Sequence, residues 1–284
     1  MIHASQLASM QNRDGGWGYR GGSPSVTEPT CFALLALAAA GWGTATAAGV
    51  DWLKRRQRAD GGWPPRDEVD QSTWVSALPL LLPPKLKEPL NIPRAVEWVS
   101  AQSGRESGWL YRLRLLLAGF GSDPQNANPG WPWYPGTAAW VAPTALTLLA
   151  LEKIQREQPS KALEERCQGG RAYLRVRRCA DGGWNHGSTR ALGYDGPSYP
   201  ETTGLALLAL HGSPIPAQSM DMARRHYREA RSMEALSWLT LGLAAHGEKA
   251  PPPADAPYPP RTTLDLALAV VAAAAPERGN IFLE

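Results

Sequence analysis

One tetrapeptide, Asp-Gly-Gly-Trp, occurs three times in this chain and limits its fold more than any other feature. It ends the segments Gln11–Trp17, Gln57–Trp63 and Arg178–Trp184. Two of these segments begin with glutamine, and the third has Arg178 in that place. Recurrence of a motif along a chain is the signature of an architecture built from repeated supersecondary units. The sequence therefore predicts tandem copies of one structural unit.

A second motif follows these turns: an extended stretch that reaches threonine and continues into a run of alanine and leucine. The five copies contain Thr30, Thr73, Thr144, Thr203 and Thr262–Thr263. Threonine is a favoured helix N-cap, because its hydroxyl accepts a hydrogen bond from an unpaired amide of the first turn. The apolar runs have almost no polar face, which is typical of helices in the interior of a larger assembly. We expect five buried helices, each capped by its threonine.

The segments before the turns have a different pattern. Residues 50–57 and 95–102 alternate apolar and charged side chains at helical spacing, as one-sided helices do. Each unit is therefore expected to contain an amphipathic outer helix, a Gly-Gly-Trp turn and a buried inner helix. About twelve helices, with no alternating strand pattern, predict an all-α fold. The expected architecture is an α/α-toroid of tandem helix hairpins, with inner and outer rings, in a single domain over residues 1–284.

The third unit is irregular, and two tryptophans compete for the repeat position. Trp131 precedes Thr144 by 13 residues, as Trp17 precedes Thr30, whereas Trp109 precedes Thr144 by 35. We therefore place the third turn at residues 129–134 and interpret residues 110–120 as an inserted helix. Residues 251–260 contain six prolines and are predicted to form a loop.

Composition excludes several classes of protein. Hydrophobic residues make up 43% of the chain and the net charge is +3, which does not indicate a nucleic-acid partner. Local arginine clusters indicate solvated helix faces or, alternatively, peripheral contact with an anionic membrane surface. The three cysteines form no Cys-x-x-Cys pair, and the N-terminus has no signal-peptide pattern. The apolar run 266–275 is too short to span a bilayer, so the expected location is the cytoplasm.

The turn motif resembles a known repeat. A glutamine, a short spacer and Gly-x-Trp after an outer helix is similar to the QW repeat of squalene-hopene and oxidosqualene cyclases. The β subunits of protein prenyltransferases share that α/α-toroid. The resemblance runs from about residue 7 to about residue 275, enough for one such domain, and it implies a central cavity for an apolar, isoprenoid-like molecule. It also implies structural roles for the repeat residues Gln11, Trp17, Gln57, Trp63, Trp131 and Trp184.

Catalytic candidates come from the starts of the inner helices. The resemblance implies an acid in an Asp-x-Asp-Asp-Thr motif, which is absent here. Alignment on the threonine leaves Glu201 at the acid position and Glu28 at the equivalent place in the first repeat, while Asp265 interrupts an apolar run. A glutamate near a helix N-terminus is stabilised as its anion, so helix-start electrostatics is the alternative reading. Because inner helices of a toroid start at one end, we expect the three carboxylates to gather and to raise one another's pKa values.

Aromatic residues in the loops before the inner helices are candidates for ligand binding. They are Tyr194, Tyr199, Trp133 and Trp140, together with His186, which lies just beyond a turn. Aromatic faces line apolar pockets and stabilise cations, although simple packing would also explain them. The zinc ligands of prenyltransferases include an Asp-x-Cys pair, which is absent. Glu28 and Cys31 with His186 or His211 remain a weaker substitute, because Cys31 is more simply a core residue. We predict no metal and no cofactor.

Three functions fit this sequence. The first is a divergent relative of the cyclases or prenyltransferases that takes an apolar, isoprenoid-like molecule. The second is a non-catalytic binding or scaffold protein that has kept the toroid. The third is a glycan-processing (α/α)-barrel enzyme with Glu28 and Glu201 facing each other. An apolar tunnel through the ring would favour the first, a filled centre the second, and an open carboxylate-lined groove the third.

Overall fold

The computed structural model describes residues 2–43, 46–108, 113, 117, 128–187, 190–191, 194–251 and 258–284. These residues form twelve α-helices, so the predicted all-α class is confirmed. The described strands are β1 (Arg190–Ala191) and β2 (Tyr194–Asp195), which pair antiparallel. Among the described helices, none combines the length and the apolar character that crossing a bilayer requires.

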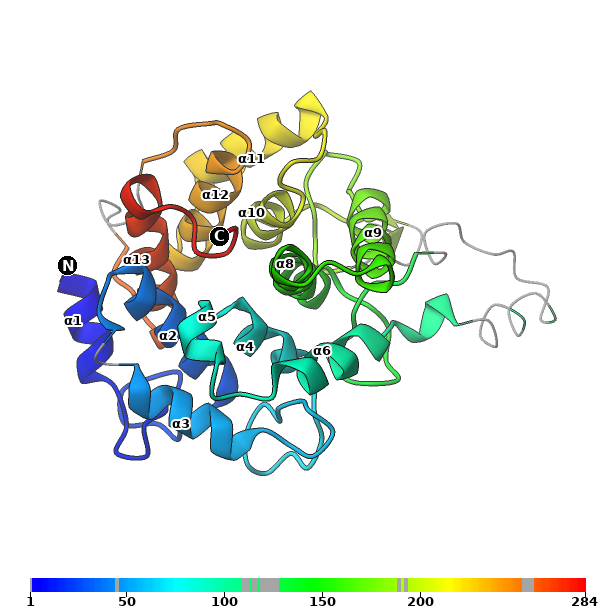
Figure 1. Cartoon of the computed structure of the whole chain (residues 1–284). Helices are drawn as coiled ribbons and strands as arrows, with labels where there is room; N and C mark the ends of the chain where they lie inside the picture. Colours follow the sequence, from blue (N-terminus) through cyan, green and yellow to red (C-terminus); the bar gives the residue numbers. More distant parts are fainter. Residues whose placement is uncertain are drawn as a thin grey trace.

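Six inner elements form a closed ring (Figure 1). Each contacts the next, and the last contacts the first. In order they are α2 (Thr27–Ala39), η2 with α4 (Trp74–Ala77 and Leu78–Leu81), α8 (Val141–Glu157), α10 (Pro200–Ala209), α12 (Met233–Ala244) and α13 (Thr263–Arg278). The apolar runs explain this placement, since α10 buries every residue from Thr202 to Ala209. A helix without a polar face is stable only when neighbours surround it.

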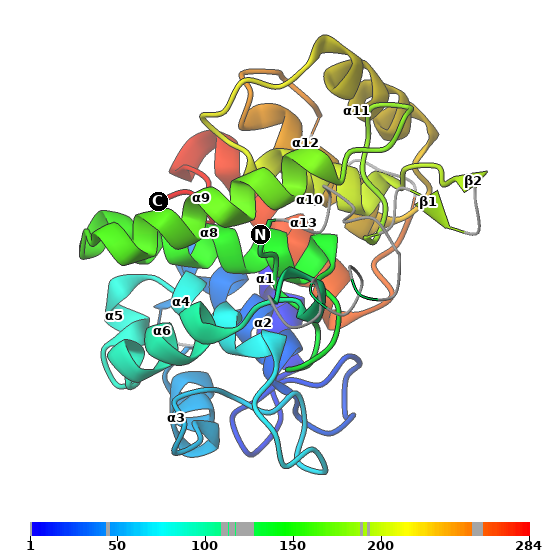
Figure 2. The ribbon, with the colours of Figure 1, turned by 90° about the vertical axis from the view of Figure 1, so that its right-hand side faces the viewer.

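Amphipathic helices lie outside this ring. They are α1 (Ile2–Ser9), α3 (Ala47–Arg56), α6 (Ile92–Ala101), α9 (Lys161–Val176) and α11 (Ala217–Glu229), with the short α5 (Pro84–Lys87) and η3 (Arg105–Ser107) in the connections. Helix α3 buries Trp52 and Leu53 and exposes Lys54 and Arg55, as its sequence pattern predicts. Figure 2 shows outer helix α9 lying along inner helix α8.

The four repeat tryptophans occupy equivalent turns. Each indole Nε1 donates to a carbonyl in the last turn of the preceding outer helix, at 2.7–2.8 Å. Each backbone N–H of the same residues donates to a hydroxyl on the following inner helix, at 2.8–3.0 Å. Trp131 makes both bonds, to Val99 and Thr144. One buried side chain thus ties an outer helix to an inner helix in each unit, and the choice of Trp131 is confirmed.

The threonines of the inner helices have a different role from the predicted one. Thr30, Thr144 and Thr203 were expected to be N-caps, but α2, α8 and α10 begin one turn earlier. Their hydroxyls lie in the first turn and accept the tryptophan N–H instead. The prediction was wrong because a buried backbone N–H needs a partner as much as a helix end does.

The second and last inner helices also differ from the simple pattern. In the second unit Ser76, not Thr73, accepts the Trp63 N–H, because Ser76 follows its tryptophan by 13 residues, as Thr30 and Thr144 follow theirs. Prolines keep α4 to a single turn. In the last inner helix Thr262 is the expected N-cap, and it forms a capping box with Asp265.

Two sequence predictions fall largely outside the described residues. In the proposed inserted helix at 110–120, only positions 113 and 117 are described. The described parts of the proline-rich segment, 251 and 258–260, are not helical.

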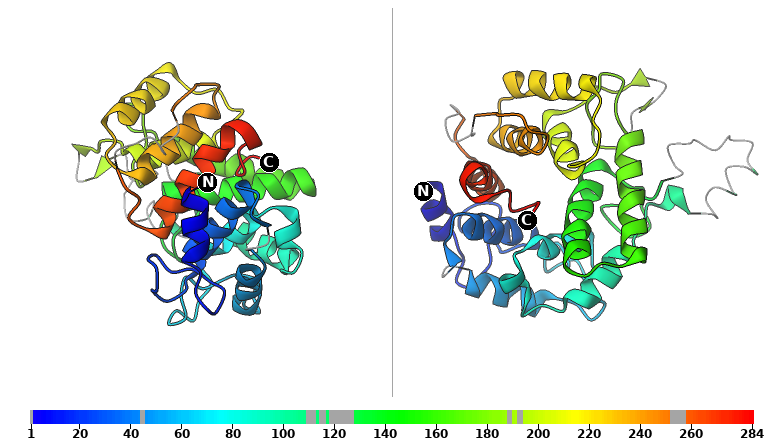
Figure 3. Two further views of the ribbon diagram at one scale, coloured as in Figure 1. Left: turned by 90° about the vertical axis from the view of Figure 1, so that its left-hand side faces the viewer. Right: turned by 45° about the horizontal axis from the view of Figure 1, so that its top comes forward.

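The centre of the ring is filled by aromatic side chains. Phe32 of α2 packs edge-on against Trp238 of α12, with ring centroids 6.1 Å apart. Phe282 contacts both, at 6.3 and 5.4 Å. We call these three residues the aromatic layer. Phe282 belongs to the tail segment, residues Gly279–Glu284, which turns back at the end of α13 and places the C-terminus inside the ring (Figures 1 and 3).

Candidate functional site

The inner helices begin at one end of the ring, which we call the start face. The residue two positions after each repeat tryptophan accepts a hydrogen bond from the first amide of a neighbouring inner helix. The pairs are Thr263 to Tyr19, Thr27 to Pro65, Trp74 to Trp133 and Val141 to His186, at 2.8–3.2 Å. These bonds link the N-termini of α13, α2, η2 and α8 in sequence. The repeat turns therefore hold the helix starts together at the start face.

Four acidic residues lie in the first turns of inner helices at this face. They are Glu28 on α2, Glu201 on α10, Glu234 on α12 and Asp265 on α13. We call them the carboxylate cluster. Glu234 interacts electrostatically with each of the other three. The structure thus brings Glu28, Glu201 and Asp265 to one end of the ring, as their positions at helix starts predicted.

Glu28 is the member whose proton affinity changes most clearly. The pKa of its carboxyl is raised to about 7, mainly by burial and in part by the nearby Glu234. The Tyr19 hydroxyl donates a hydrogen bond to Oε2, which opposes this shift. The same interaction and burial raise the pKa of Tyr19. At neutral pH Glu28 is therefore divided between its acid and its anion, although it lies at a helix N-terminus that favours the anion.

Glu234 was missed by the sequence reasoning. Its side chain is exposed, yet partial desolvation at the start face raises the pKa of its carboxyl, and Glu201 and Asp265 add to this effect. The signal was present, because Glu234 follows the N-cap Ser232 by two residues, as Glu201 follows the N-cap Tyr199. The other inner helices were identified by a threonine near their start. Helix α12 has no threonine in its first turn, and its N-cap is Ser232.

Asp265 has a structural explanation. Its Oδ2 accepts hydrogen bonds from the backbone amides of Arg261 and Thr262, at 2.7 and 3.0 Å. Its own amide donates to the Thr262 hydroxyl, which completes the capping box. These bonds account for a carboxylate in an otherwise apolar run.

Aromatic side chains surround the carboxylate cluster on the start face. Trp133 packs edge-on against Trp74 with centroids 4.7 Å apart, and His186 lies 5.0 Å from Tyr199. Trp140 and Tyr199 are the N-cap residues of α8 and α10, and both are partly exposed. Four of the five predicted ligand-binding residues therefore lie at helix starts or turns of this face. Tyr134, another loop aromatic that the sequence indicates, lies there too, together with Tyr19 and Trp74, which the sequence did not single out.

The fifth candidate, Tyr194, has a side chain that lies outside the described part of the structure. The weaker zinc hypothesis receives no geometric support: among the described residues, no three acidic, cysteine or histidine side chains are grouped closely enough to hold a metal ion. Cys31 is buried in the core, as its position in an apolar helix predicted.

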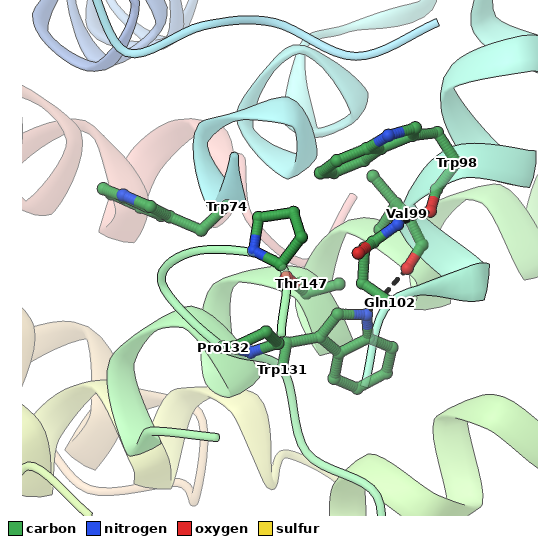
Figure 4. A pocket seen from close by; sticks show the side chains of 8 residues that line it. Trp74, Trp98, Val99, Gln102, Trp131, Pro132 and Thr147 are labelled. Carbon is green, nitrogen blue, oxygen red and sulfur yellow. Dashed lines mark hydrogen bonds between the residues drawn. The ribbon is translucent and has the colours of Figure 1, made fainter. Parts of the chain in front are cut away.

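A groove of about 580 Å³ opens beside Tyr19. Arg20 and Arg66 line it together with Asp67 and Glu68. The Tyr19 hydroxyl on the edge of this groove donates a hydrogen bond to Glu28, although no residue of the carboxylate cluster lines the groove itself. By contrast, the gap bordered by Trp74, Trp98, Gln102 and Trp131 holds only about 10 Å³ (Figure 4). That is room for about one water molecule, so the packing behind Trp131 is closed.

A serine–histidine pair beside the N-terminus of α10 has a structural explanation for its serine. Ser198 Oγ lies 2.7 Å from His226 Nε2, and it donates to Asp181 at 2.9 Å. The serine–aspartate bond recurs in the first and second units, where Ser25 donates to Asp14 and Ser72 to Asp60. A contact that recurs in every Asp-Gly-Gly-Trp turn supports the turn rather than a nucleophile.

The chain was compared with protein families, with individual proteins and with solved structures. No family model matches the chain. Over 67 residues, 23% of this chain, it is 46% identical to the drimenyl diphosphate synthase of Streptantibioticus cattleyicolor. The matched stretch is only 12% of that enzyme's length.

Among solved structures, an alpha-amylase from Clostridium perfringens matches 96% of this chain and 97% of its own with a TM-score of 0.63. Its sequence identity is 9%, so the likeness shows the helical toroid alone. A protein from Actinoplanes, 18% identical over 96% of both chains, has a TM-score of 0.43.

Proposed function

We propose that the protein is an enzyme that protonates an apolar, isoprenoid-like substrate, with Glu28 as the acid. The observation that carries this proposal is the raised pKa of Glu28, about 7, inside a cluster of carboxylates. A general acid is most effective when its pKa lies near the working pH. The sequence lacks the aspartate motif of the cyclases, and this cluster supplies a different acid at the same end of the ring.

The aromatic layer lies directly beneath the acid. Phe32 follows Glu28 by four residues, and Trp238 follows Glu234 by four, so each pair shares one helix face. One helical turn separates the members of a pair by about 6 Å. Aromatic faces stabilise positive charge more strongly where water is excluded. A cation formed next to Glu28 would therefore meet the π faces of Phe32 and Trp238.

The chemistry is an isomerisation. Glu28 transfers its proton to one carbon of an alkene, and the positive charge forms on the neighbouring carbon. A second alkene attacks that carbon and closes a ring, after which a proton is lost to an ionised carboxylate of the cluster. One proton enters and one leaves, so product and substrate have the same mass. The neighbouring Glu234 increases the fraction of Glu28 that is protonated at neutral pH.

The sequence match supports this substrate class. The matched relative is named for the synthesis of a terpenoid diphosphate, although the match covers a small part of it. The filled centre of the ring is the result expected of a non-catalytic scaffold, so an apolar, isoprenoid-like substrate is a proposal that requires this centre to open.

A second candidate is glycan hydrolysis, and the gathered carboxylates favour it. Glycosidases use two carboxyl groups on either side of the bond that breaks. Glu28, Glu201 and Glu234 come from three different helices and meet at one face, next to partly exposed aromatic side chains. The likeness to the alpha-amylase is one of fold and adds nothing to this candidate.

The test is product analysis with a fifteen-carbon prenyl diphosphate and, in parallel, a maltooligosaccharide. We expect an isomer of unchanged mass from the prenyl diphosphate, detected by liquid chromatography and mass spectrometry. Glu28→Gln should reduce its formation about 100-fold or more, the usual range for loss of a general acid. Glu97→Gln, on the exposed side of outer helix α6, is the matched control and should leave formation of the isomer unchanged.

Shorter sugars with new reducing ends would support the second candidate instead. Equal turnover by Glu28→Gln and the unchanged protein would remove Glu28 from the acid role.

A further inference from the structure

The tail segment is held inside the ring by two cations of α8. The Lys153 ammonium donates to the carbonyls of Leu81 and Ile281, at 2.8 and 2.7 Å. Arg156 donates to the carbonyl of Leu283 at 2.7 Å. Between these contacts Ile281 and Phe282 are buried, and Phe282 completes the aromatic layer. The apolar residues Ile281–Leu283 thus fill the middle of the ring. The cationic side chains of Lys153 and Arg156 bind their backbone carbonyls.

Lys153 is an unusual cation because it is only 2% exposed and has neutral partners. Within the described part of the chain, it forms no ion pair within 4 Å of a carboxylate. Burial lowers the pKa of its ammonium to about 8, Lys87 and Arg156 contribute, and the nearby carboxylates of Glu157 and Glu284 oppose this shift. A buried charge is costly unless an opposite charge or several hydrogen bonds compensate it. The two carbonyls therefore stand where an anionic group would be a stronger partner.

Cavities lie on both sides of the tail segment. One, of about 450 Å³, is mostly apolar and is lined by Leu241, Ala272, Asn280 and Leu283, among others. The second, of about 480 Å³, is lined by Lys153, Arg278, Ile281 and Glu284, among others. Each has the size of a small-molecule site, about 300–1,000 Å³. Both cavities lie at the C-terminal ends of inner helices, and residues of the tail segment line each of them, so moving this segment would enlarge the space at that end of the ring.

We propose that the tail segment occupies the substrate site itself: an isoprenoid chain takes the place of Ile281, Phe282 and Leu283, and its diphosphate binds Lys153 and Arg156. This inference rests on the proposed function, whose substrate class it specifies. The apolar side chains stand in for the prenyl chain, and the carbonyls of Ile281 and Leu283 stand in for phosphate oxygens. The centre of the ring is filled in this conformation by a part of the chain that a ligand replaces.

The dimensions agree with a prenyl chain of intermediate length. On α8, Ala142 holds the place that Glu28 holds on α2, as the second residue of its helix. At about 1.5 Å per residue, Lys153 lies about 16 Å further along the axis. An extended fifteen-carbon prenyl chain spans a comparable length. A diphosphate at Lys153 would therefore place the far end of the chain beside Phe32 and the acid.

The tail segment has a pivot. Helix α13 ends at Gly279, whose φ of +85° is readily adopted by glycine and rarely by other residues. The following turn is closed by Asn280, whose side chain accepts from the Phe282 amide at 3.1 Å. Rotation at Gly279 would withdraw the segment without disturbing α13.

Two substitutions in the full chain test the site. Phe282→Ala removes the aromatic ring that fills the centre but keeps the backbone bonds of the tail segment to Lys153. Affinity for farnesyl diphosphate should therefore rise about tenfold. Lys153→Met should weaken farnesyl diphosphate binding at least tenfold and leave the uncharged alcohol, farnesol, unaffected. Leu163→Ala, buried on outer helix α9, is the control for a core substitution away from the site. Binding is measured by calorimetry, with circular dichroism and melting curves to establish folding.

A fluorescent probe separates this inference from the proposed function. Anilinonaphthalene sulfonate is apolar and anionic, and its binding requires no turnover. We expect one site with higher affinity in folded Phe282→Ala than in the Leu163→Ala control. Turnover of farnesyl diphosphate with unchanged affinities in Phe282→Ala and Lys153→Met would overturn this site but not Glu28 as the acid. Tighter binding without any turnover would support the site and overturn the reaction.

Discussion

At the scale of single residues, the repeat tryptophan makes two different connections, and the sequence motif does not distinguish between them. Its indole binds the outer helix and its backbone amide binds the inner helix. The first glycine of each Asp-Gly-Gly-Trp turn has a positive φ, as at Gly61 with +94°, which few other residues adopt. The motif therefore specifies a turn and a helix junction together.

Trp63→Ala should destabilise the protein by about 3–5 kcal/mol, because it removes a fully buried ring and leaves a cavity. Urea denaturation measures the change. Trp140→Ala is the matched control, since that ring is partly exposed, and it should cost much less. Equal losses for both substitutions would contradict the structural role of Trp63.

Glu28 should make stability depend on pH. Folding raises its pKa from 4.5 to about 7, so the folded protein binds more protons than the unfolded protein between these values. Stability therefore falls as pH rises through this window. Glu28→Gln lacks this effect, so its stability relative to the unchanged protein should improve between pH 5 and pH 8. Urea denaturation at both values checks it, and a constant difference would show that Glu28 is not perturbed.

Asp265→Ala should cost about 0.5–2 kcal/mol, the usual range for losing a helix cap. Its carboxylate bonds two backbone amides, and the lost bonds explain the effect. If Asp265 is only a cap, turnover of the prenyl diphosphate should stay within about twofold at a temperature where the variant is folded. A large loss of turnover without loss of stability would return Asp265 to the catalytic group.

At the scale of elements, the hydroxyls inside the first turns of the inner helices link each helix to a turn. A sequence can show that a threonine lies near a helix start, but it cannot show whether the helix begins before or after it. Here Tyr199 precedes Thr203 by four residues and is the true N-cap. That one-turn error also put Glu201 before the helix, whereas it lies inside the first turn.

Thr144→Val tests this linkage. The substitution keeps the shape of the side chain but leaves the buried Trp131 amide without its partner. The expected loss is about 1–3 kcal/mol, the cost of an unsatisfied buried donor. Thr137→Val, on an exposed turn, is the control and should change stability by less than about 0.5 kcal/mol. Thermal or urea denaturation would show no difference between the two if the hydroxyl merely packed.

At the scale of the whole molecule, the ring and most of its start face could be predicted from the repeated motifs. Periodic apolar runs specified five inner helices, but they did not specify α12 as an inner helix or show that the ring closes. The gathering of Glu28 and Glu201 followed from equivalent positions in equivalent units. The filling of the ring by Phe282 could not be predicted, because Ile281–Leu283 is three apolar residues with no repeat partner. Contacts between distant segments, such as Phe282 with Phe32, leave no periodic signal.

The layers along the ring axis are the centre of this account: a carboxylate cluster at the start face, the aromatic layer beneath it and the tail segment below. Their chemistry depends on Glu28 being half protonated near neutral pH. Carbon NMR of protein labelled at the glutamate carboxyl carbons measures this directly, with Glu28→Gln to assign the signal. The account predicts a titration near pH 7. A Glu28 signal that titrates near the ordinary value of 4.5, or below it, would contradict the proposed acid.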